Sequence, residues 1–214
     1  MIGKLIVIEG TDAVGKGTQS KLLAKRLEAC GKAAEIINFP TYGSEFGKLI
    51  KRYLAGDFGD KERFPPEVIS MLYALDRYQY SQTLGKKLRS GSYLICNRYS
   101  QSNLYQAAKI PSGKGRERFI IWFESMESRL PKADVVVFLN LPGRASRKLL
   151  KARGEKIDIH EKDLHYQEAV RKLYLWEARK RKWIVINCST GGALKSKDAI
   201  SQEIFSALKR KLNC

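Results

Sequence analysis

The chain has 214 residues, which suits one α/β domain with a substantial buried core. A hydrophobic content of 43% and an aromatic content of 10% exclude an intrinsically disordered chain. Forty lysines and arginines against 22 aspartates and glutamates give a net charge of +18, which suits phosphate-bearing substrates but also nucleic acid or an acidic surface. Because the basic residues are spread along the chain, charge alone does not choose between these partners.

Cysteine spacing and hydrophobicity indicate the cellular compartment of the protein. Cys30, Cys96, Cys188 and Cys214 are far apart and form no Cys-x-x-Cys pair, which excludes the common zinc patterns and argues against a disulfide framework. Cys96 and Cys188 end apolar runs, so we expect them to be small core residues. The first apolar run begins too early for a signal peptide, and no run is long enough to span a membrane. We therefore expect a cytoplasmic protein without a membrane partner.

Apolar runs and helical patterns alternate along the whole chain. The apolar runs predict buried strands at Leu5–Glu9, Glu35–Phe39, Tyr93–Asn97, Val135–Asn140 and Trp183–Asn187. The segments between and after them predict helices at Lys16–Cys30, Glu45–Leu54, Pro66–Leu88, Gln101–Lys109, Arg116–Arg129, Ala145–Ala152, Asp163–Arg181 and Ala199–Leu212. This order predicts an α/β fold with an open parallel five-stranded sheet and helices on both faces. No repeat or linker interrupts it, so we expect one domain over residues 1–214.

A phosphate-binding loop joins the first strand to the first helix. Its spacing is Gly10-x4-Gly15-Lys16, in which bare amides wrap the phosphates and the lysine reaches the β and γ oxygens. The alternative without a ligand is a tight strand-to-helix turn with an exposed lysine. The motif predicts a P-loop NTPase-type fold and an ATP site. That site comprises Gly10, Thr11, Asp12, Ala13, Val14, Gly15, Lys16, Gly17 and Thr18.

Two further loops follow strands of the predicted sheet, at Pro40-Thr41-Tyr42 and at Asn97-Arg98-Tyr99. Ligands of open α/β sheets bind outside the carboxyl ends of the strands. We therefore expect both loops to share one crevice with the phosphate loop.

Several blocks, in this order along the chain, resemble the thymidylate kinases. They are Gly10-x-Asp12, Gly15-Lys16-Gly17-Thr18-Gln19, Phe39-Pro40-Thr41-Tyr42-Gly43, the helix Leu72-Tyr73-Ala74-Leu75-Asp76-Arg77, and Asn97-Arg98-Tyr99 with Ser102-Asn103 and Tyr105-Gln106. The resemblance implies phosphoryl transfer from ATP to dTMP with Mg²⁺. It also implies a substrate site formed by Asp12, Phe39, Pro40, Tyr42, Tyr73, Arg77, Arg98, Ser102, Asn103, Tyr105 and Gln106.

The residue types suit these implied roles. Arg98 can clamp the acceptor phosphate because its planar fork bonds two oxygens at once. Tyr73 and Arg77 lie four residues apart and would share a helix face around one flat base, although an ordinary helix shows the same spacing. Asp12 would orient the sugar 3′-hydroxyl or an arginine. We expect Lys16, Arg98, Asp12 and a lid arginine to be the catalytic residues.

Three positions depart from the family pattern. Gly17 replaces the usual magnesium-binding Ser or Thr, Asn97 replaces the usual aspartate, and Thr41 replaces a frequent arginine. We therefore expect magnesium to be held mostly through water, with Thr18 as a weak ligand and Glu9 or Asp12 nearby.

The segment Lys148 to Glu161 is a basic helix end followed by a glycine-hinged loop, and it resembles the lid of these kinases. We expect a short lid at about 148–162, in which Arg153 is the first candidate for the transition-state cation, followed by Lys151 and Lys156. The alternative is a solvated basic loop. The spacing of His160 and His165 fits no standard metal site, so we expect surface roles for both.

Two alternatives concern assembly and function. The helix Arg116–Arg129 is apolar nearly all round, which predicts contact either with the core or with a second subunit, and the resemblance favours a homodimer. The rival functions are another nucleoside monophosphate or deoxynucleoside kinase and, less favoured, a non-catalytic nucleotide-dependent protein that binds nucleic acid.

Overall fold

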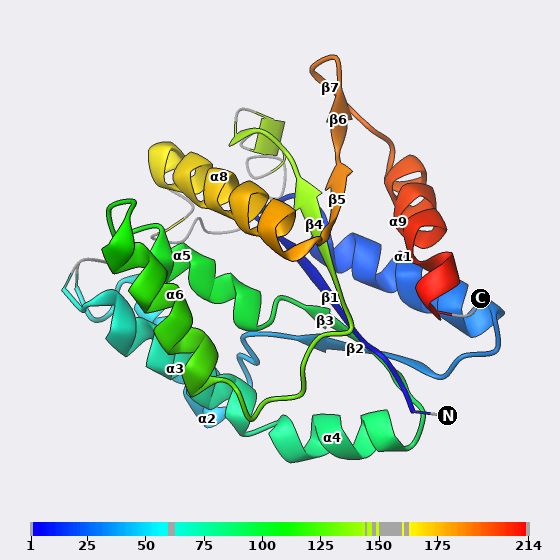
Figure 1. The fold of residues 1–214 in the computed structure, drawn as a ribbon, viewed down its shortest axis with the longest axis horizontal. Coiled ribbons are helices and arrows are strands. Elements are labelled where there is room, and N and C mark those ends of the chain that lie inside the picture. Colours follow the sequence, from blue (N-terminus) through cyan, green and yellow to red (C-terminus); the bar gives the residue numbers. More distant parts are fainter. Residues whose placement is uncertain are drawn as a thin grey trace.

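The computed structural model describes residues 2–59, 63–143, 145, 146, 149, 160 and 163–212. A parallel sheet of five strands runs through the centre in the order β2-β3-β1-β4-β5. The strands are β1 (Leu5–Gly10), β2 (Ala34–Asn38), β3 (Tyr93–Asn97), β4 (Val135–Asn140) and β5 (Ile184–Asn187). The predicted strands and fold class are confirmed, with strand ends within one residue of those expected. After β5, a short antiparallel pair projects from the body of the protein (Figure 1). It consists of β6 (Ser189–Thr190) and β7 (Ala193–Leu194).

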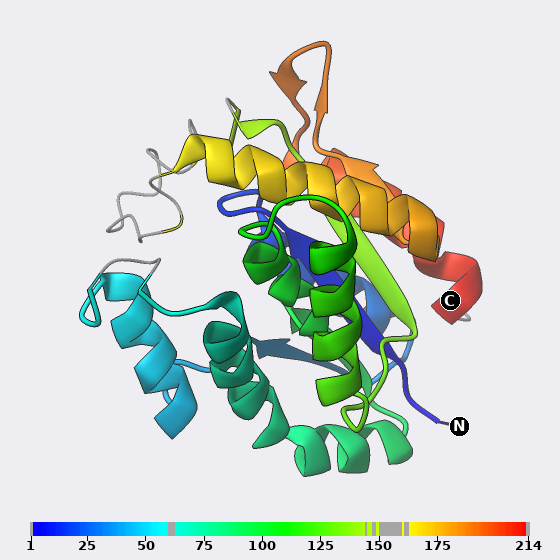
Figure 2. The same ribbon diagram turned by 60° about the vertical axis from the view of Figure 1, so that its left-hand side comes forward.

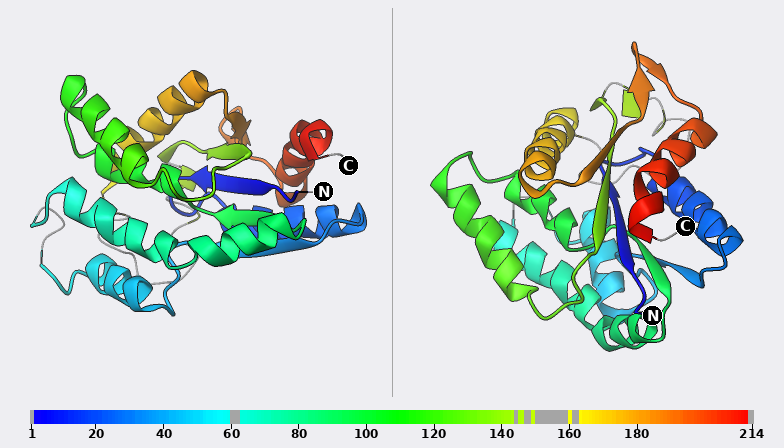
Figure 3. Two further views of the ribbon diagram at one scale, coloured as in Figure 1. Left: turned by 60° about the horizontal axis from the view of Figure 1, so that its bottom comes forward. Right: turned by 45° about the vertical axis from the view of Figure 1, so that its right-hand side comes forward.

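Helices cover both faces of the sheet. On one face lie α1 (Lys16–Ala29) and α9 (Lys197–Leu212), side by side in Figures 1 and 3. The other face carries the remaining described helices, with α2 packed on α3 (Figure 2). These are α2 (Glu45–Ala55), α3 (Pro66–Tyr78), α4 (Ser81–Arg89), the 3₁₀ helix η1 (Ser100–Asn103), α5 (Leu104–Ala107), α6 (Lys114–Met126) and α8 (Leu164–Arg181).

The two faces of β1 explain why its sequence is apolar without alternation. Ile6 and Ile8 pack into a cluster with α1 and α9, whereas Leu5 and Val7 pack into a cluster on the opposite face. Successive side chains of a strand point to opposite faces, so a strand covered on both sides must be apolar at every position. The central strand is therefore fixed by two cores at once. Cys96 and Cys188 are buried in these cores, as expected.

Two predicted helices differ from the structure. The helix expected over Pro66–Leu88 is divided into α3 and α4, with a break at Gln79 and Tyr80. No glycine or proline marks this break. Tertiary contacts produce it, because the Tyr78 hydroxyl donates to the Met126 carbonyl oxygen at 2.6 Å and the Tyr80 ring packs on Phe39 at a centroid distance of 6.0 Å.

The helix expected at Gln101–Lys109 forms as η1 followed by the single turn of α5. The helix expected at Ala145–Ala152 lies mostly outside the described residues. None of the described helices has the length and hydrophobicity that crossing a membrane requires.

Candidate active site

The loop between β1 and α1 has a backbone that only glycine fits at its first position. Gly10 has a φ of 156°, and a Cβ there would lie 2.7 Å from Val14 Cγ2 and 2.9 Å from the Leu139 carbonyl oxygen. Gly15 caps α1 with a φ of 87°. The loop therefore turns tightly and ends at the amino terminus of a helix, where free amides and the helix dipole favour phosphate.

Lys16, the first residue of α1, bends back over this loop. Its Nζ donates to the carbonyl oxygens of Gly10 at 3.1 Å and Thr11 at 2.7 Å, and its side chain is buried. The ammonium is thus held above the loop that would carry the donor phosphates. The expected ATP-site residues Gly10 to Thr18 all lie in this loop and the first turn of α1.

A second cation reaches the same loop from β3. Arg98 follows β3 and donates from Nη1 to the Gly10 carbonyl oxygen at 3.4 Å, while its Nη2 forms an ion pair with Asp12 Oδ1. The guanidinium also lies over the Tyr105 ring, 5.1 Å from its centroid. Lys16 and Arg98 therefore converge on one carbonyl oxygen, although they are 82 residues apart (98 − 16) in the sequence.

Asp12 is the acceptor at the centre of this cluster. Besides Arg98, it accepts from the Tyr105 hydroxyl at 3.0 Å and from Gln167 Nε2 at 2.8 Å. Burial would raise the pKa of Asp12, but the charges of Arg98 and Lys16 outweigh it and lower the pKa to about 2. The carboxylate is therefore ionised at neutral pH.

The Arg98 guanidinium is correspondingly fixed in its charged form. Burial lowers its pKa, but the neighbouring Tyr105, Asp12 and Glu9 raise it well above the ordinary value. The backbone of Arg98 has a φ of 68°, an uncommon conformation for a residue with a side chain. Its amide donates to the Ile8 carbonyl oxygen at 3.1 Å, which ties this conformation to β1.

Glu9 holds the segment after Arg98 in place. Its fully buried carboxylate accepts from the Tyr99 amide at 2.9 Å, from the Ser102 hydroxyl at 3.0 Å and from the Tyr174 hydroxyl at 2.8 Å. These bonds connect β1 with η1 and α8. Glu9 is engaged by protein donors, so its structural role is to position η1.

A pocket of about 70 Å³ opens beside the Asp12–Arg98 pair. It is lined by Asp12, Pro40, Tyr42, Leu54, Tyr73, Arg98, Ser102, Tyr105, Gln106 and His160. The lining thus brings together all three loops expected in one crevice, together with the aromatic ring expected on α3. Eight of the eleven residues that the family resemblance assigned to the substrate site are in this set.

Asn103 and Gln106 carry buried polar atoms that have no partner among the residues that the structure describes. Both amide atoms of Asn103 and the Oε1 of Gln106 are buried without a hydrogen bond within the described part of the chain. Both residues are 1% exposed. Because an unpaired buried polar group costs roughly 1–3 kcal/mol, such groups beside a pocket indicate a polar ligand edge.

The comparisons with known proteins agree with this geometry. A family model described as thymidylate kinase matches residues 8–204. The chain belongs to the thymidylate kinase family. A probable thymidylate kinase from Pyrococcus abyssi is 33% identical over 216 residues, which cover 99% of this chain and 98% of that protein. Thymidylate kinase from Schizosaccharomyces pombe is 34% identical over 174 residues, covering 79% and 78%.

A solved structure extends the likeness to the fold. Thymidylate kinase from Candida albicans superposes with a TM-score of 0.76 and 25% identity, covering 99% of this chain and 93% of that one. These findings confirm the resemblance, the P-loop NTPase-type fold and the enzyme class, because thymidylate kinases are nucleoside monophosphate kinases.

Three residues expected at the substrate, Phe39, Arg77 and Asn103, do not line the pocket. Arg77 is buried in α3 and donates to Glu127 Oε1 from Nε, at 2.8 Å, and from Nη2. Glu127 at the end of α6 holds the guanidinium, and Arg77 is not among the residues that line the pocket. Phe39 is also buried, packing on Tyr80 and Tyr99, and is part of the core.

Asp76 and Gly47 explain the shape of the loop that holds Pro40 and Tyr42. Asp76 is buried and accepts from the Thr41 amide at 2.9 Å, from the Thr41 hydroxyl and from the Ser44 hydroxyl at 3.0 Å. A Cβ on Gly47 would lie 1.8 Å from the Thr41 carbonyl oxygen, so α2 can approach the loop only with glycine here. Thr41 thus belongs to the scaffold of the loop.

His160 and Gln167 lie in the site but were not expected there. His160 is 4% exposed, lines the pocket and lies 3.2 Å from the Tyr53 hydroxyl through Nε2, so the expected surface role was wrong. His165 is exposed. Gln167 on α8 reaches both Asp12 and the His160 carbonyl oxygen. Because Gln167 and Asp12 are 155 residues apart in the sequence, no local pattern reveals this contact.

Gly17 and Asn97 are neighbours in the structure. A Cβ on Gly17 would lie 3.8 Å from Asn97 Nδ2, and that amide donates to Asn38 Oδ1 at 2.9 Å. The Oδ1 of Asn97 is buried without a partner in the described residues. Two of the departures from the family pattern therefore meet at one point beside the phosphate loop. The expected lid residues Lys151, Arg153 and Lys156 lie outside the described residues.

Proposed function

We propose that this protein transfers the γ-phosphoryl group of ATP to dTMP, giving ADP and dTDP. The observation that carries the proposal is the convergence of Lys16 and Arg98 on the Gly10 carbonyl oxygen. One cation lies on the donor loop and the other lines the acceptor pocket, so the phosphates of two nucleotides would meet between them. Thymidylate kinases among the relatives and the family match support dTMP as the acceptor.

The chemistry requires positioning and charge neutralisation. The acceptor phosphate is already ionised, so it attacks the γ-phosphorus in line without a strong base. Arg98 holds the acceptor phosphate, Lys16 stabilises the transferring group, and Asp12 keeps Arg98 oriented or bonds the sugar 3′-hydroxyl. We also propose that Arg153, with Lys151 and Lys156, brings lid cations to the transition state.

The base would occupy the part of the pocket near α3 and α5. Tyr73 offers a ring for stacking, and Gln106 lines the pocket with an amide oxygen that has no partner in the described part of the chain. Gln106, with Asn103 next to Ser102 in the chain, would bond the pyrimidine edge. Pro40 and Tyr42 border the sugar side, and Ser102 and Tyr105 complete the wall between the base and the acceptor phosphate.

Magnesium fits this site through water. Mg²⁺ retains several waters and binds nucleotide phosphates with few protein ligands. Asn97 provides a buried oxygen without a partner in the described chain, where Gly17 provides no side chain. Asn97 would accept from a metal-bound water, and Thr18 would lie nearby. The ion would neutralise charge on the ATP phosphates.

The direct test incubates the purified protein with ATP, Mg²⁺ and each nucleoside monophosphate in turn and separates the products by chromatography. We expect dTDP, and a loss of about 10²–10³-fold in rate for Lys16→Ala. Lys21→Ala, an exposed lysine of the same helix, is the matched control and should retain activity. Product from AMP or CMP alone would overturn the thymidylate assignment, and no product from any acceptor would overturn the kinase assignment.

We also propose a homodimer of a single kinase domain, residues 1–214, acting in the cytoplasm. Val68, Met71 and Leu75 form an exposed apolar stripe on α3, and Ile121 of α6 is 66% exposed. Phe119, Ile120 and Phe123 of α6 instead belong to the core. The apolar run of this helix would therefore contact the core on one side and the second subunit on the other. The free thiols Cys30, Cys96 and Cys188 suit a reducing compartment.

Sedimentation would test the assembly. We expect a dimer that Leu75→Asp converts to a monomer, because a charge would be buried in the contact. A monomeric wild-type protein at micromolar concentration would contradict the proposal.

A further inference from the structure

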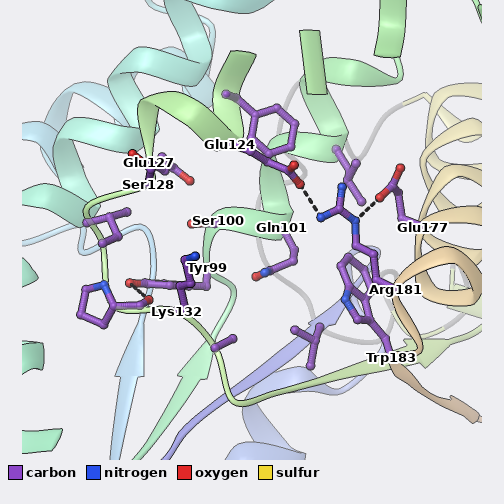
Figure 4. A pocket seen from close by; sticks show the side chains of 16 residues that line it. Tyr99, Ser100, Gln101, Glu124, Glu127, Ser128, Lys132, Glu177, Arg181 and Trp183 are labelled. Carbon is purple, nitrogen blue, oxygen red and sulfur yellow. Dashed lines mark hydrogen bonds and ion pairs between the residues drawn. The ribbon is translucent and has the colours of Figure 1, made fainter. Parts of the chain in front are cut away.

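A second cavity, of about 450 Å³, lies between η1, α6, α8 and the strand β4 (Figure 4). Its volume is within the usual range of small-molecule sites. The lining residues are Tyr99, Ser100, Gln101, Leu104, Phe123, Glu124, Glu127, Ser128, Leu130, Pro131, Lys132, Ala133, Val136, Glu177, Arg181 and Trp183. None of them lines the candidate active-site pocket.

The two cavities share a wall. Gln101 and Leu104 line the second cavity, whereas Ser102 and Tyr105 line the pocket beside Arg98. The segment η1–α5 therefore has one face toward each cavity. The second cavity is a separate site directly behind the candidate acceptor site.

Three oxygen atoms of the lining are buried and have no hydrogen-bond partner in the part of the chain that the structure describes. They are Oε1 of Gln101, Oε2 of Glu127 and Oε1 of Glu177. Glu127 is 5% exposed and Glu177 is 1% exposed. Burying acceptors without donors is costly, so three around one cavity indicate a ligand that donates hydrogen bonds.

The charges of the lining limit the kind of ligand. Glu127 is already paired with Arg77, and Glu124 and Glu177 flank the Arg181 guanidinium (Figure 4). The lining carries two cations, Lys132 and Arg181, against the three carboxylates of Glu124, Glu127 and Glu177, so its net charge disfavours a phosphate. The described residues contain no group of three or more His, Cys, Asp or Glu side chains arranged to hold a metal.

The remaining lining is apolar or aromatic. Leu104, Phe123, Leu130 and Val136 are buried, and Trp183 closes one side. Such walls suit a flat apolar body rather than a small hydrated ion. We propose that this cavity binds a small aromatic molecule bearing N–H donors, such as an amine or amidine, and that Gln101, Glu127 and Glu177 accept its hydrogen bonds.

Titration calorimetry with benzamidine tests the site. Benzamidine joins a flat ring to a fork of N–H donors, and benzoate has the same shape with acceptors only. We expect benzamidine to bind the full-length protein at one site with a Kd on the order of 1 mM or tighter, and benzoate to bind at least about tenfold more weakly.

Two serines near the end of α6 provide a matched pair of variants. Ser128 is exposed and lines the cavity, so Ser128→Trp should fill it and weaken benzamidine binding at least about tenfold. Ser125 is also exposed but lies outside the lining, so Ser125→Trp should change Kd less than about twofold. Gln101→Leu removes one acceptor and should weaken binding about three- to tenfold, which keeps the test decisive if Ser128→Trp does not fold.

Three results would overturn the inference. They are the absence of any heat of binding from benzamidine at about 10 mM, binding of benzamidine to Ser128→Trp as tight as to the wild type, and binding of benzoate as tight as that of benzamidine. Heat from Mg²⁺ alone that disappears in Gln101→Leu would assign the cavity to a cation instead.

Discussion

The buried ion pair between Arg77 and Glu127 gives the sharpest test of the packing between α3 and α6. Both side chains are 2% exposed, and the guanidinium bonds one carboxylate oxygen through two nitrogens. Removing one partner leaves a charge buried without compensation, which costs about 3–5 kcal/mol. We therefore expect Arg77→Met and Glu127→Leu each to lower the free energy of unfolding by that amount.

The double variant should behave differently. Replacing both charges with apolar side chains removes the uncompensated charge, so Arg77→Met/Glu127→Leu should lie within about 2 kcal/mol of the wild type. For a chain of this length, about 1 kcal/mol changes Tm by about 2–4 °C, so the single variants should melt about 6–20 °C lower. Urea denaturation and thermal melts monitored by circular dichroism would measure both quantities.

An exposed pair on α2 is the control. Lys48 and Glu45 are 58% and 85% exposed, and Lys48→Met should change stability by no more than about 0.5 kcal/mol. The argument fails if Arg77→Met is as stable as the wild type, or if the double variant loses the sum of the two single losses.

Three further predictions concern the candidate active site. Asp12 has a folded pKa lowered to about 2, so its contribution to stability is present above its ordinary pKa of 3.8 and is lost as pH falls toward 2. Asp12→Asn should therefore cost about 2 kcal/mol at pH 7 in urea denaturation, and a difference that does not shrink below pH 4 would contradict this. Gln167→Leu should lower kcat/KM about tenfold with little change in stability, because it removes a 2.8 Å bond to Asp12, and unchanged kinetics would refute the positioning role. Gly47→Ala should raise KM for dTMP at least about tenfold, whereas Gly43→Ala, where a Cβ meets nothing within 4 Å, should change it less than about twofold.

The parts of the site that the sequence predicted are those whose signal is local. Gly10, Gly15 and Lys16 lie within seven residues, and their backbone conformation and charge follow from residue type alone. The parallel sheet could also be predicted from the sequence, because a strand covered on both faces is apolar at every position. The convergence of three loops then followed from sheet geometry.

The missed features depend on partners distant in the sequence. Arg77 was expected beside Tyr73, but Glu127, 50 residues away, sets its orientation. The break between α3 and α4 carries no glycine or proline and arises from contacts of Tyr78 and Tyr80 with other elements. The sequence predicts a surface position for His160 because its contact with Tyr53 joins residues 107 apart in the chain.

Adjacent residues of β1 serve the two halves of the site. Gly10 offers its carbonyl oxygen to Lys16 and Arg98, and Glu9, directly before it, fixes Tyr99 and Ser102 on the acceptor side. The phosphate loop and the Arg98 segment are therefore both held by hydrogen bonds to the end of β1, a strand whose residues are all buried. A reaction catalysed by positioning depends on the distance between two bound groups, and a shift of about 1 Å can cost on the order of 10²-fold in rate. Anchoring both groups to neighbouring residues of one strand, buried on both faces, fixes that distance, which is the property that phosphoryl transfer between two nucleotides requires.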